Sequence, residues 1–284
     1  MPEYSICITN YNCGPTMESS LHSILEQLDD RFEIVVVDNL STDASRETLR
    51  KFEANGKLKL IERRCSIGKG LQIAFENATG EYVLSGLDLG DSYKSRLVSF
   101  LDFYHKKCDG KLLKTRNEAV IVAPRSLIER LGGWRDLQRS EGWDLWSRAA
   151  KAGVYLWTIF ILTENRIRGS FRAEIEAHPE RRNFVEKYRH RYTVYRDSLR
   201  LGRRLFAPSS HVGLGQRLVQ ILALASLPFY PSYESGLPDF EPYEPENFID
   251  SRDWWLEEAI RSGDDLKRER MYYKNHLTGF AKPL

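Results

Sequence analysis

Four polar clusters, each after a short apolar run, contain the residues best suited to chemistry. They span residues 9–12, 38–43, 66–70 and 88–91. A carboxylate where a strand ends can accept hydrogen bonds from a nucleobase or a sugar hydroxyl, and paired carboxylates can hold Mg²⁺ or Mn²⁺ against a diphosphate. Open parallel sheets bind their ligands where the strands end, so we expect the clusters to face one site.

The first two clusters suit a nucleoside. Thr9 and Asn12 follow the first apolar run, and Asp38 follows the second, close to Ser41 and Thr42. Small polar side chains at these places can hold a base or a ribose. The alternative is an ordinary strand-to-helix turn, because Asp and Ser are common in such turns. Each cluster alone is therefore a weak signal.

The third and fourth clusters suit phosphate and a metal ion. Residues 66–70 (SIGKG) offer backbone N–H groups at a helix start and the cation of Lys69, although they do not form a Walker motif. Asp88 and Asp91 lie in the fourth cluster and could bind a divalent cation. The alternative for these two carboxylates is a polar surface loop.

An alternation of strand and helix patterns positions the clusters. Apolar runs predict strands at 4–8, 33–37, 57–62, 82–84, 119–123 and 154–162. Helical spacing predicts helices at 17–28, 44–54, 69–77, 96–106, 126–131 and 144–152. Ser41 or Thr42 is expected to cap the helix that begins at residue 44. The pattern predicts an α/β fold with a mostly parallel sheet and helices on both faces.

The last third of the chain has a different pattern and two blocks of opposite charge. Predicted helices lie at 183–206, 215–227 and 253–261, the last with Ser251 as its cap. Residues 181–204 contain nine Lys and Arg against two acids, whereas residues 234–269 contain twelve acids against four bases. The predicted division is a core (1–165), a basic helical region (166–230) and an acidic tail (231–284).

The composition is that of a soluble globular protein, with 284 residues, 42% apolar and 29% charged. A net charge of +2 gives no reason to expect nucleic-acid binding. Four cysteines lack metal-site spacing and favour a reducing compartment. The sequence begins without a signal-peptide pattern, and its longest apolar stretch, 218–230, is shorter than the ~20 residues of a bilayer span. We therefore expect a cytoplasmic protein.

The order of the clusters resembles that in family 2 glycosyltransferases, the inverting GT-A enzymes that use nucleotide sugars. The resemblance covers roughly residues 3–165. Its matching segments are SICITNYN (5–12), EIVVVDN (33–39), STD (41–43), GKG (68–70), ATGEYVL (78–84), the acidic loop 88–91, GGW (132–134) and SEGWDLWSR (140–148). The resemblance implies a GT-A, Rossmann-like fold, a nucleotide-sugar donor and a Mg²⁺ or Mn²⁺ cofactor.

The resemblance also assigns roles to single residues. It places Thr9, Asn12 and Asp38 on the nucleoside, with Asp38 on the base. It places Lys69 near the base or the diphosphate. Asp88 matches the first Asp of the family's Asp-x-Asp motif.

Two positions depart from the family pattern. The family's metal-binding Asp falls on Gly90, and its catalytic base falls on Gly142. Glycine can neither ligate a cation nor take a proton. Asp91 could bind the metal in place of Gly90. Glu141, which matches the acceptor-side Glu of the family's Glu-Asp pair, or Asp144 could act as base.

The favoured function is transfer of a sugar from a UDP- or GDP-sugar to an acceptor hydroxyl or a lipid phosphate, with inversion. The alternative is a degenerate GT-A protein that binds a nucleotide or a partner without catalysis, which Gly90 and Gly142 favour. Residues 181–230 combine a basic amphipathic helix with an apolar segment, which suits the surface of an anionic membrane. Alternatively, their Arg residues pair with the acidic tail, within one chain or between subunits of a homo-oligomer.

Overall fold

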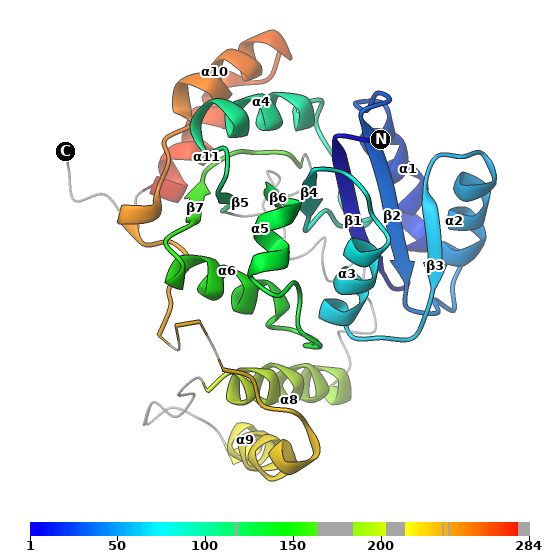
Figure 1. The fold of residues 1–284 in the computed structure, drawn as a ribbon, viewed down its shortest axis with the longest axis vertical. Coiled ribbons are helices and arrows are strands. Elements are labelled where there is room, and N and C mark those ends of the chain that lie inside the picture. Colours follow the sequence, from blue (N-terminus) through cyan, green and yellow to red (C-terminus); the bar gives the residue numbers. More distant parts are fainter. Residues whose placement is uncertain (117–118, 164–183, 203–213, 235, 238, 278–284) are drawn as a thin grey trace.

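The computed structural model describes residues 1–116, 119–163, 184–202, 214–234, 236–237 and 239–277. A seven-stranded sheet forms its centre, with α3 and α5 on the near face and α1 behind (Figure 1). The strands are β1 (Tyr4–Asn10), β2 (Phe32–Asp38), β3 (Lys59–Glu62), β4 (Tyr82–Ser85), β5 (Leu112–Thr115), β6 (Ile121–Pro124) and β7 (Tyr155–Thr158).

Ten α-helices lie in the described part of the chain. Those of the first half are α1 (Gly14–Leu25), α2 (Ser45–Ala54), α3 (Ile67–Glu76), α4 (Leu97–Lys107), α5 (Arg125–Arg130) and α6 (Glu141–Lys151). The others are α8 (Phe184–Arg200), α9 (Leu214–Ser226), α10 (Arg252–Arg261) and α11 (Leu266–Leu277). Short 3₁₀ turns, η2 (Leu227–Phe229) and η3 (Pro245–Asn247), lie between them.

The sheet is mostly parallel, as the sequence predicts. Its strand order is β3-β2-β1-β4-β6-β5-β7. Only β6 runs antiparallel to its neighbours within this sheet. Val35, Val36 and Val37 of β2 are fully buried because strands pair with β2 on both edges and α3 packs against it. Asn10 pairs with Asp38 across β1 and β2, so the first two polar clusters leave the sheet side by side.

Two described elements are not predicted by the sequence patterns. One is β5, whose central Lys114 interrupts the apolar run although its side chain is buried. The Lys114 ammonium donates to the Thr115 carbonyl at 2.8 Å and to the Tyr243 hydroxyl at 3.0 Å, which satisfies the buried charge. The other is α11, a mainly polar helix. The last predicted core strand, 154–162, is also shorter in the structure and ends at Thr158.

The predicted cap of α2 is wrong. Ala44 occupies the N-cap position and α2 has no side-chain cap. The Ser41 hydroxyl instead donates to Asp38 at 2.6 Å and accepts from the Asn12 N–H at 2.9 Å. Ser251 does occupy the N-cap position of α10, but its hydroxyl donates to the Ile159 carbonyl at 2.7 Å and does not cap the helix.

The acidic tail packs on the core. The Ile249 N–H donates to the Trp157 carbonyl of β7 at 2.9 Å. The Lys94 ammonium lies 2.9 Å from Asp264 and 2.7 Å from Glu269, which both belong to the tail. Fully buried Arg96 pairs with the same two acids. Asp264 and Glu269 of the tail therefore form ion pairs with the core and not with α8.

Helices α8 and α9 form a hairpin at the end of the molecule opposite the N-terminus (Figure 1). Strand β1 begins near the N-terminus, so the hairpin lies beyond the carboxyl ends of the parallel strands. No helix in the described segments is both long enough and apolar enough to cross a lipid bilayer.

Candidate functional site

Asp38 holds the loop between β2 and α2 in place. Its buried carboxylate accepts hydrogen bonds from the Asn10 amide at 2.7 Å, the Ser41 hydroxyl at 2.6 Å and the Ser41 N–H at 2.8 Å. With 0% exposure, it does not reach solvent. In this structure Asp38 therefore positions the second polar cluster against the first. Its predicted contact with a nucleobase stays a prediction.

Asn12 and Thr9 extend this contact between clusters. Asn12 adopts a left-handed backbone conformation with φ of 54°. Its side-chain oxygen accepts from the Thr42 N–H at 2.8 Å. A Cβ added at Gly70 would lie 2.6 Å from the Thr9 methyl group, so only glycine lets the start of α3 approach the end of β1 this closely. The first cluster therefore contacts both the second and the third.

The start of α3 carries the third cluster. Ser66 is its N-cap, and its hydroxyl accepts from the Lys69 N–H at 3.1 Å. Lys69 is partly exposed, and its ammonium has no ion-pair partner in the described segments. An unpaired cation beside the N-terminus of a ten-residue helix favours a negatively charged group.

The fourth cluster lies level with the first because Ser85, the last residue of β4, pairs with Cys7 of β1. The Thr16 hydroxyl of α1 donates to the Leu89 carbonyl at 3.0 Å and fixes the loop after β4. Asp88 is exposed in this loop, and one of its carboxylate oxygens accepts from the Gly90 N–H at 2.9 Å. The structure thus places all four predicted clusters at the same edge of the sheet.

Glu141 begins α6 next to this edge. A Cβ added at Gly68 would lie 2.9 Å from the Glu141 Cβ, so the starts of α3 and α6 are in contact. The Glu141 Oε2 atom is buried and has no hydrogen-bond partner among the described residues. Burial raises the pKa of Glu141 to about 7. A carboxylate with this pKa and one oxygen without a hydrogen-bond partner has the properties of a general base at neutral pH.

Asp144 has a different environment, although it lies one helical turn later. Its carboxylate is fully buried between two guanidinium groups, 2.9 Å from Arg135 and 2.6 Å from Arg148. Arg148 also donates to the Gly133 carbonyl at 2.8 Å. Asp144 therefore ties α6 to the loop that contains Gly132, Gly133 and Trp134. Between the two predicted bases, the geometry favours Glu141.

Comparison with known proteins agrees with this geometry. A family model described as "Glycosyl transferase family 2" matches residues 5–86. The match covers less than a third of the chain, so residues 5–86 are similar to glycosyltransferase family 2. TuaG of Bacillus subtilis, named for teichuronic acid biosynthesis, is 30% identical over 106 residues, which are 36% of this chain and 42% of TuaG. TarS of Staphylococcus aureus, a poly(ribitol-phosphate) β-N-acetylglucosaminyltransferase, is 27% identical over 138 residues, which are 45% of this chain and 24% of TarS. The chain thus spans less than half the length of these curated relatives.

Solved structures show the same fold. Residues 1–349 of Staphylococcus aureus TarS align with a TM-score of 0.54 at 15% identity, over 100% of this chain and 93% of that chain. A mannosyltransferase from Pyrobaculum calidifontis, solved with GDP-Man and Mn²⁺, aligns with a TM-score of 0.52 at 18% identity, over 99% of this chain and 81% of that chain. The predicted GT-A fold with a helical C-terminal part is confirmed.

The family 2 resemblance implies a divalent cation. The described residues near the loop after β4 do not supply enough ligands to hold one. Asp88 offers one exposed carboxylate, and Gly90 offers none. Asp91 lies in the same turn, where its N–H donates to the Asp88 carbonyl at 3.0 Å. Among the described residues, no group of three His, Cys, Asp or Glu side chains could hold a metal ion. The donor set does not fit a cation held by the protein alone.

Gly142, where the sequence analysis expects the second departure from the family 2 pattern, packs against Trp146 of the same helix. A Cβ added at Gly142 would lie 2.9 Å from the Trp146 indole. The Lys114 ammonium lies 4.4 Å from the centre of the same indole, in a cation–π contact. Trp146 thus occupies the space beside position 142. The sequence pattern gives no signal for the contact between Lys114 and Trp146, because Lys114 belongs to β5 and Trp146 to α6.

Proposed function

We propose that the protein is a glycosyltransferase that transfers a sugar from a UDP- or GDP-sugar to an acceptor, with inversion at the anomeric carbon. The observation that carries the proposal is Glu141, which lies at the start of α6 against Gly68. Its Oε2 atom is buried without a hydrogen-bond partner among the described residues, and burial raises its pKa to about 7. The family 2 match over residues 5–86 and the GT-A fold support a nucleotide-sugar donor.

In the proposed reaction, Glu141 accepts the proton of an acceptor hydroxyl while the hydroxyl oxygen attacks the anomeric carbon. The bond from that carbon to the diphosphate oxygen breaks, and the nucleoside diphosphate leaves with the electron pair. The Lys69 ammonium stabilises the leaving charge. A lipid phosphate is already ionised at neutral pH and needs no base, so a base such as Glu141 favours a hydroxyl acceptor over a phosphate.

We assign Thr9 and Asn12 to the nucleoside, with Asp38 holding their loop, and Lys69 and Asp88 to the diphosphate side. Asp88 and Asp91 are the two carboxylates that we propose as ligands if Mg²⁺ or Mn²⁺ binds, and no step of the proposed reaction is routed through the metal.

Release of UDP or GDP from a panel of UDP- and GDP-sugars, with and without Mn²⁺ and with a broad acceptor panel, tests the proposed function. We expect release with at least one donor, and faster release when an acceptor is present. Tight nucleotide binding without release for any donor and acceptor would contradict catalysis. That result would favour the degenerate GT-A protein to which Gly90 and Gly142 point.

The charge of Lys69 gives a separate prediction. Lys69→Met keeps most of the side-chain length but removes the cation, so we expect UDP or GDP to bind about 10- to 100-fold more weakly, since hydrogen bonds to charged groups contribute ~1.5–3 kcal/mol. Uridine or guanosine, which lack the diphosphate, should bind as they do to the wild type. Calorimetry measures both. Lys57→Met, a change of an exposed lysine just before β3, is the matched control. An equal loss for nucleoside and nucleotide would refute the assignment.

We also propose that the outer face of α9 binds the surface of an anionic membrane. Leu218, Ile221 and Leu222 are exposed at helical spacing, and Phe229 continues the apolar surface. Helices α8 and α9 together carry six Lys and Arg against two acids. An exposed apolar face on a cationic hairpin suits a layer of anionic headgroups.

Co-sedimentation with phosphatidylglycerol-containing vesicles tests the membrane proposal. The wild type should sediment with them and not with phosphatidylcholine vesicles, and the double change Ile221→Ser and Leu222→Ser should abolish binding. Ile260→Ser on α10 is the control, because Ile260 and Ile221 are 60% and 61% exposed. Analytical ultracentrifugation would contradict the membrane proposal if it showed that the wild type dimerises and that the double variant does not. That result would indicate that this face of α9 is the contact of a homo-oligomer.

A further inference from the structure

Asp197 is a fully buried carboxylate of α8 that contacts the loop before α6. Its Oδ2 atom accepts hydrogen bonds from the Gln138 N–H at 2.6 Å and from the Arg139 N–H at 3.0 Å. We propose that Asp197 is a positioning residue, which holds the start of α6 so that Glu141 keeps its place beside the donor site. The inference rests on the proposed glycosyltransferase function and adds a residue that acts through the proposed base.

The loop before α6 is held from two sides. On one side, the Gly68 N–H of α3 donates to the Leu137 carbonyl at 2.9 Å. On the other side, Asp197 accepts from the next two N–H groups along the chain. Glu141 begins α6 directly after this loop, and α3 also carries Lys69. The two contacts therefore fix the proposed base relative to the proposed diphosphate site.

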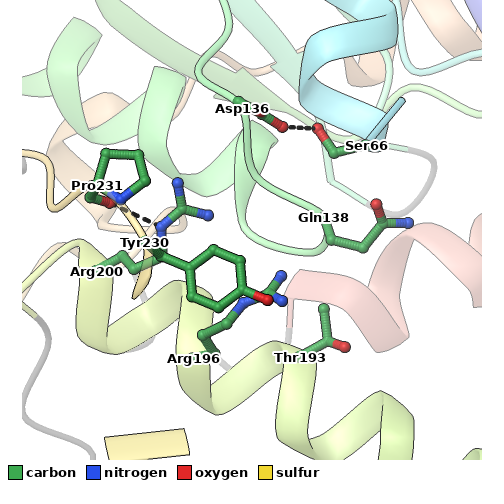
Figure 2. A pocket seen from close by; sticks show the side chains of 8 residues that line it. All are labelled: Ser66, Asp136, Gln138, Thr193, Arg196, Arg200, Tyr230 and Pro231. Carbon is green, nitrogen blue, oxygen red and sulfur yellow. Dashed lines mark hydrogen bonds between the residues drawn. The ribbon is translucent and has the colours of Figure 1, made fainter. Parts of the chain in front are cut away.

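The other oxygen of Asp197 is compensated within α8. The Oδ1 atom lies 2.9 Å from the Arg196 guanidinium and 3.5 Å from that of Arg200. Figure 2 shows these two side chains and Gln138 around a cavity of about 310 Å³ between α8 and the loop. Arg196 also lies 4.4 Å from the centre of the Tyr230 ring, in a cation–π contact. Two cations thus fix the orientation of the buried carboxylate, which leaves Oδ2 for the loop.

The start of α6 depends on this outside support. Ser140 is the N-cap of α6 but makes no capping hydrogen bond through its side chain. The Oε2 atom of Glu141 has no hydrogen-bond partner among the described residues, so no bond to that oxygen holds the side chain. A general base must lie within hydrogen-bond reach of the proton it accepts, and a misplacement of ~1 Å can cost ~10²-fold in rate. The backbone contacts of Asp197 therefore bear directly on transfer.

The charge of Asp197 acts on the proposed base as well. Burial is the main cause of the raised pKa of Glu141, Arg139 opposes it, and the like charge of Asp197 raises the pKa further. From α3, uncharged Gly68 makes the contact, and Lys69 follows it. Other charged groups of these elements have partners of their own, namely Arg135 and Arg148 with Asp144, Asp136 with Ser66, and Arg196 and Arg200 with Asp197.

Asp197→Asn tests the inference. The amide nitrogen would face either the loop N–H groups or the guanidinium groups, so asparagine cannot keep both sets of contacts. We expect transfer to slow about 10- to 100-fold while the Kd for UDP or GDP stays that of the wild type. The pH below which the transfer rate falls should move from about 7 toward the ordinary Glu value of ~4.3, because a like charge is lost and water gains access.

Single-turnover rates across the pH range measure both effects, and an NMR titration of the Glu141 carboxyl carbon measures its pKa without any transfer. Arg196→Met is the matched variant, because it removes a partner of Oδ1 but leaves both hydrogen bonds of Oδ2. It disturbs the same buried cluster, yet it should not lower the pKa of Glu141. Asp102→Asn, at an exposed position of α4, should leave transfer and its pH dependence unchanged.

Two results for Asp197→Asn would overturn the inference. One is a Glu141 pKa and a pH dependence equal to those of the wild type. The other is loss of nucleotide binding together with transfer, which would make Asp197 a residue of the general fold. Failure of the proposed function would differ from both, because the wild type would then release no nucleotide with any acceptor, whereas the titration of Glu141 does not depend on transfer.

Discussion

Glu141→Gln is expected to slow sugar transfer about 10²- to 10⁴-fold, which is the usual contribution of a general base. Glutamine keeps the size of the side chain but cannot accept a proton from the acceptor hydroxyl. We expect kcat to fall while the Kd for UDP or GDP stays within about twofold of the wild type, because we propose that Glu141, at the start of α6, contacts the acceptor and not the nucleotide. Single-turnover transfer rates measure the effect, and Glu18→Gln on exposed α1 surface is the control.

The pH dependence should identify the same group. The pKa of Glu141 is raised to about 7 by burial, so the carboxylate is the base only above that pH. The transfer rate of the wild type should therefore fall as the pH drops below about 7. The residual transfer rate of Glu141→Gln should not show this fall at low pH. If the rate of the variant falls below pH 7 in the same way, another group is the base.

The raised pKa also predicts an effect on stability, with a defined sign. The fold favours the protonated form of Glu141 over the ionised form. Stability is therefore lost as the pH rises from the ordinary Glu range through about 7. Glu141→Gln removes this cost, so the variant should melt at a higher temperature than the wild type at pH 8 and at a similar temperature near pH 4. Such a cost is common where a group serves function.

Asp144→Ala is expected to lower the free energy of unfolding by about 3–5 kcal/mol, because it leaves two partly buried guanidinium groups without their fully buried carboxylate. Arg135 lies 2.9 Å and Arg148 2.6 Å from Asp144 in the wild type. The loss is a large part of a typical total of ~5–15 kcal/mol. Urea unfolding followed by circular dichroism measures it.

The contrast between the two acids is the informative result. Asp144→Ala should lose stability, and any loss of transfer should follow the fraction of unfolded protein. A variant that keeps its free energy of unfolding within about 1 kcal/mol of the wild type but loses transfer would instead make Asp144 the base.

The nucleotide-side half of the site follows well from the sequence. Parallel strands carry their carboxyl ends to one edge, so apolar runs followed by polar clusters predict which residues meet. The pairing of Asn10 with Asp38 and the approach of Gly70 to Thr9 confirm that these clusters lie together. The position of Lys69 at the start of α3 follows from the same logic.

The roles of single carboxylates could not be predicted in this way. Asp38, Glu141 and Asp144 all follow or begin predicted elements, but the sequence pattern does not show which of them is buried and which is ion-paired. Asp144 is neutralised by Arg135 from the preceding loop, whereas Glu141 lies beside Gly68 of α3 with its Oε2 atom lacking a hydrogen-bond partner among the described residues. The alternation of apolar and polar residues along the chain does not predict which carboxylates form ion pairs.

The C-terminal part shows the same limit. Charge blocks suggest that the basic helix and the acidic tail neutralise each other, yet Asp264 and Glu269 pair with Lys94 and Arg96 of the core. The residue within α8 that fixes it to the core is Asp197, one of its few acids. Total charge per segment therefore did not identify the contacts.

A crystal structure of the protein with UDP or GDP tests the central claim most directly, since it shows whether the four clusters form one donor site. We expect the nucleoside beside Thr9 and Asn12, and the diphosphate beside Lys69 and Asp88. The open side of the diphosphate should face Glu141. A nucleotide bound away from the carboxyl edge of the sheet, or a diphosphate out of reach of Lys69 and Asp88, would contradict the account.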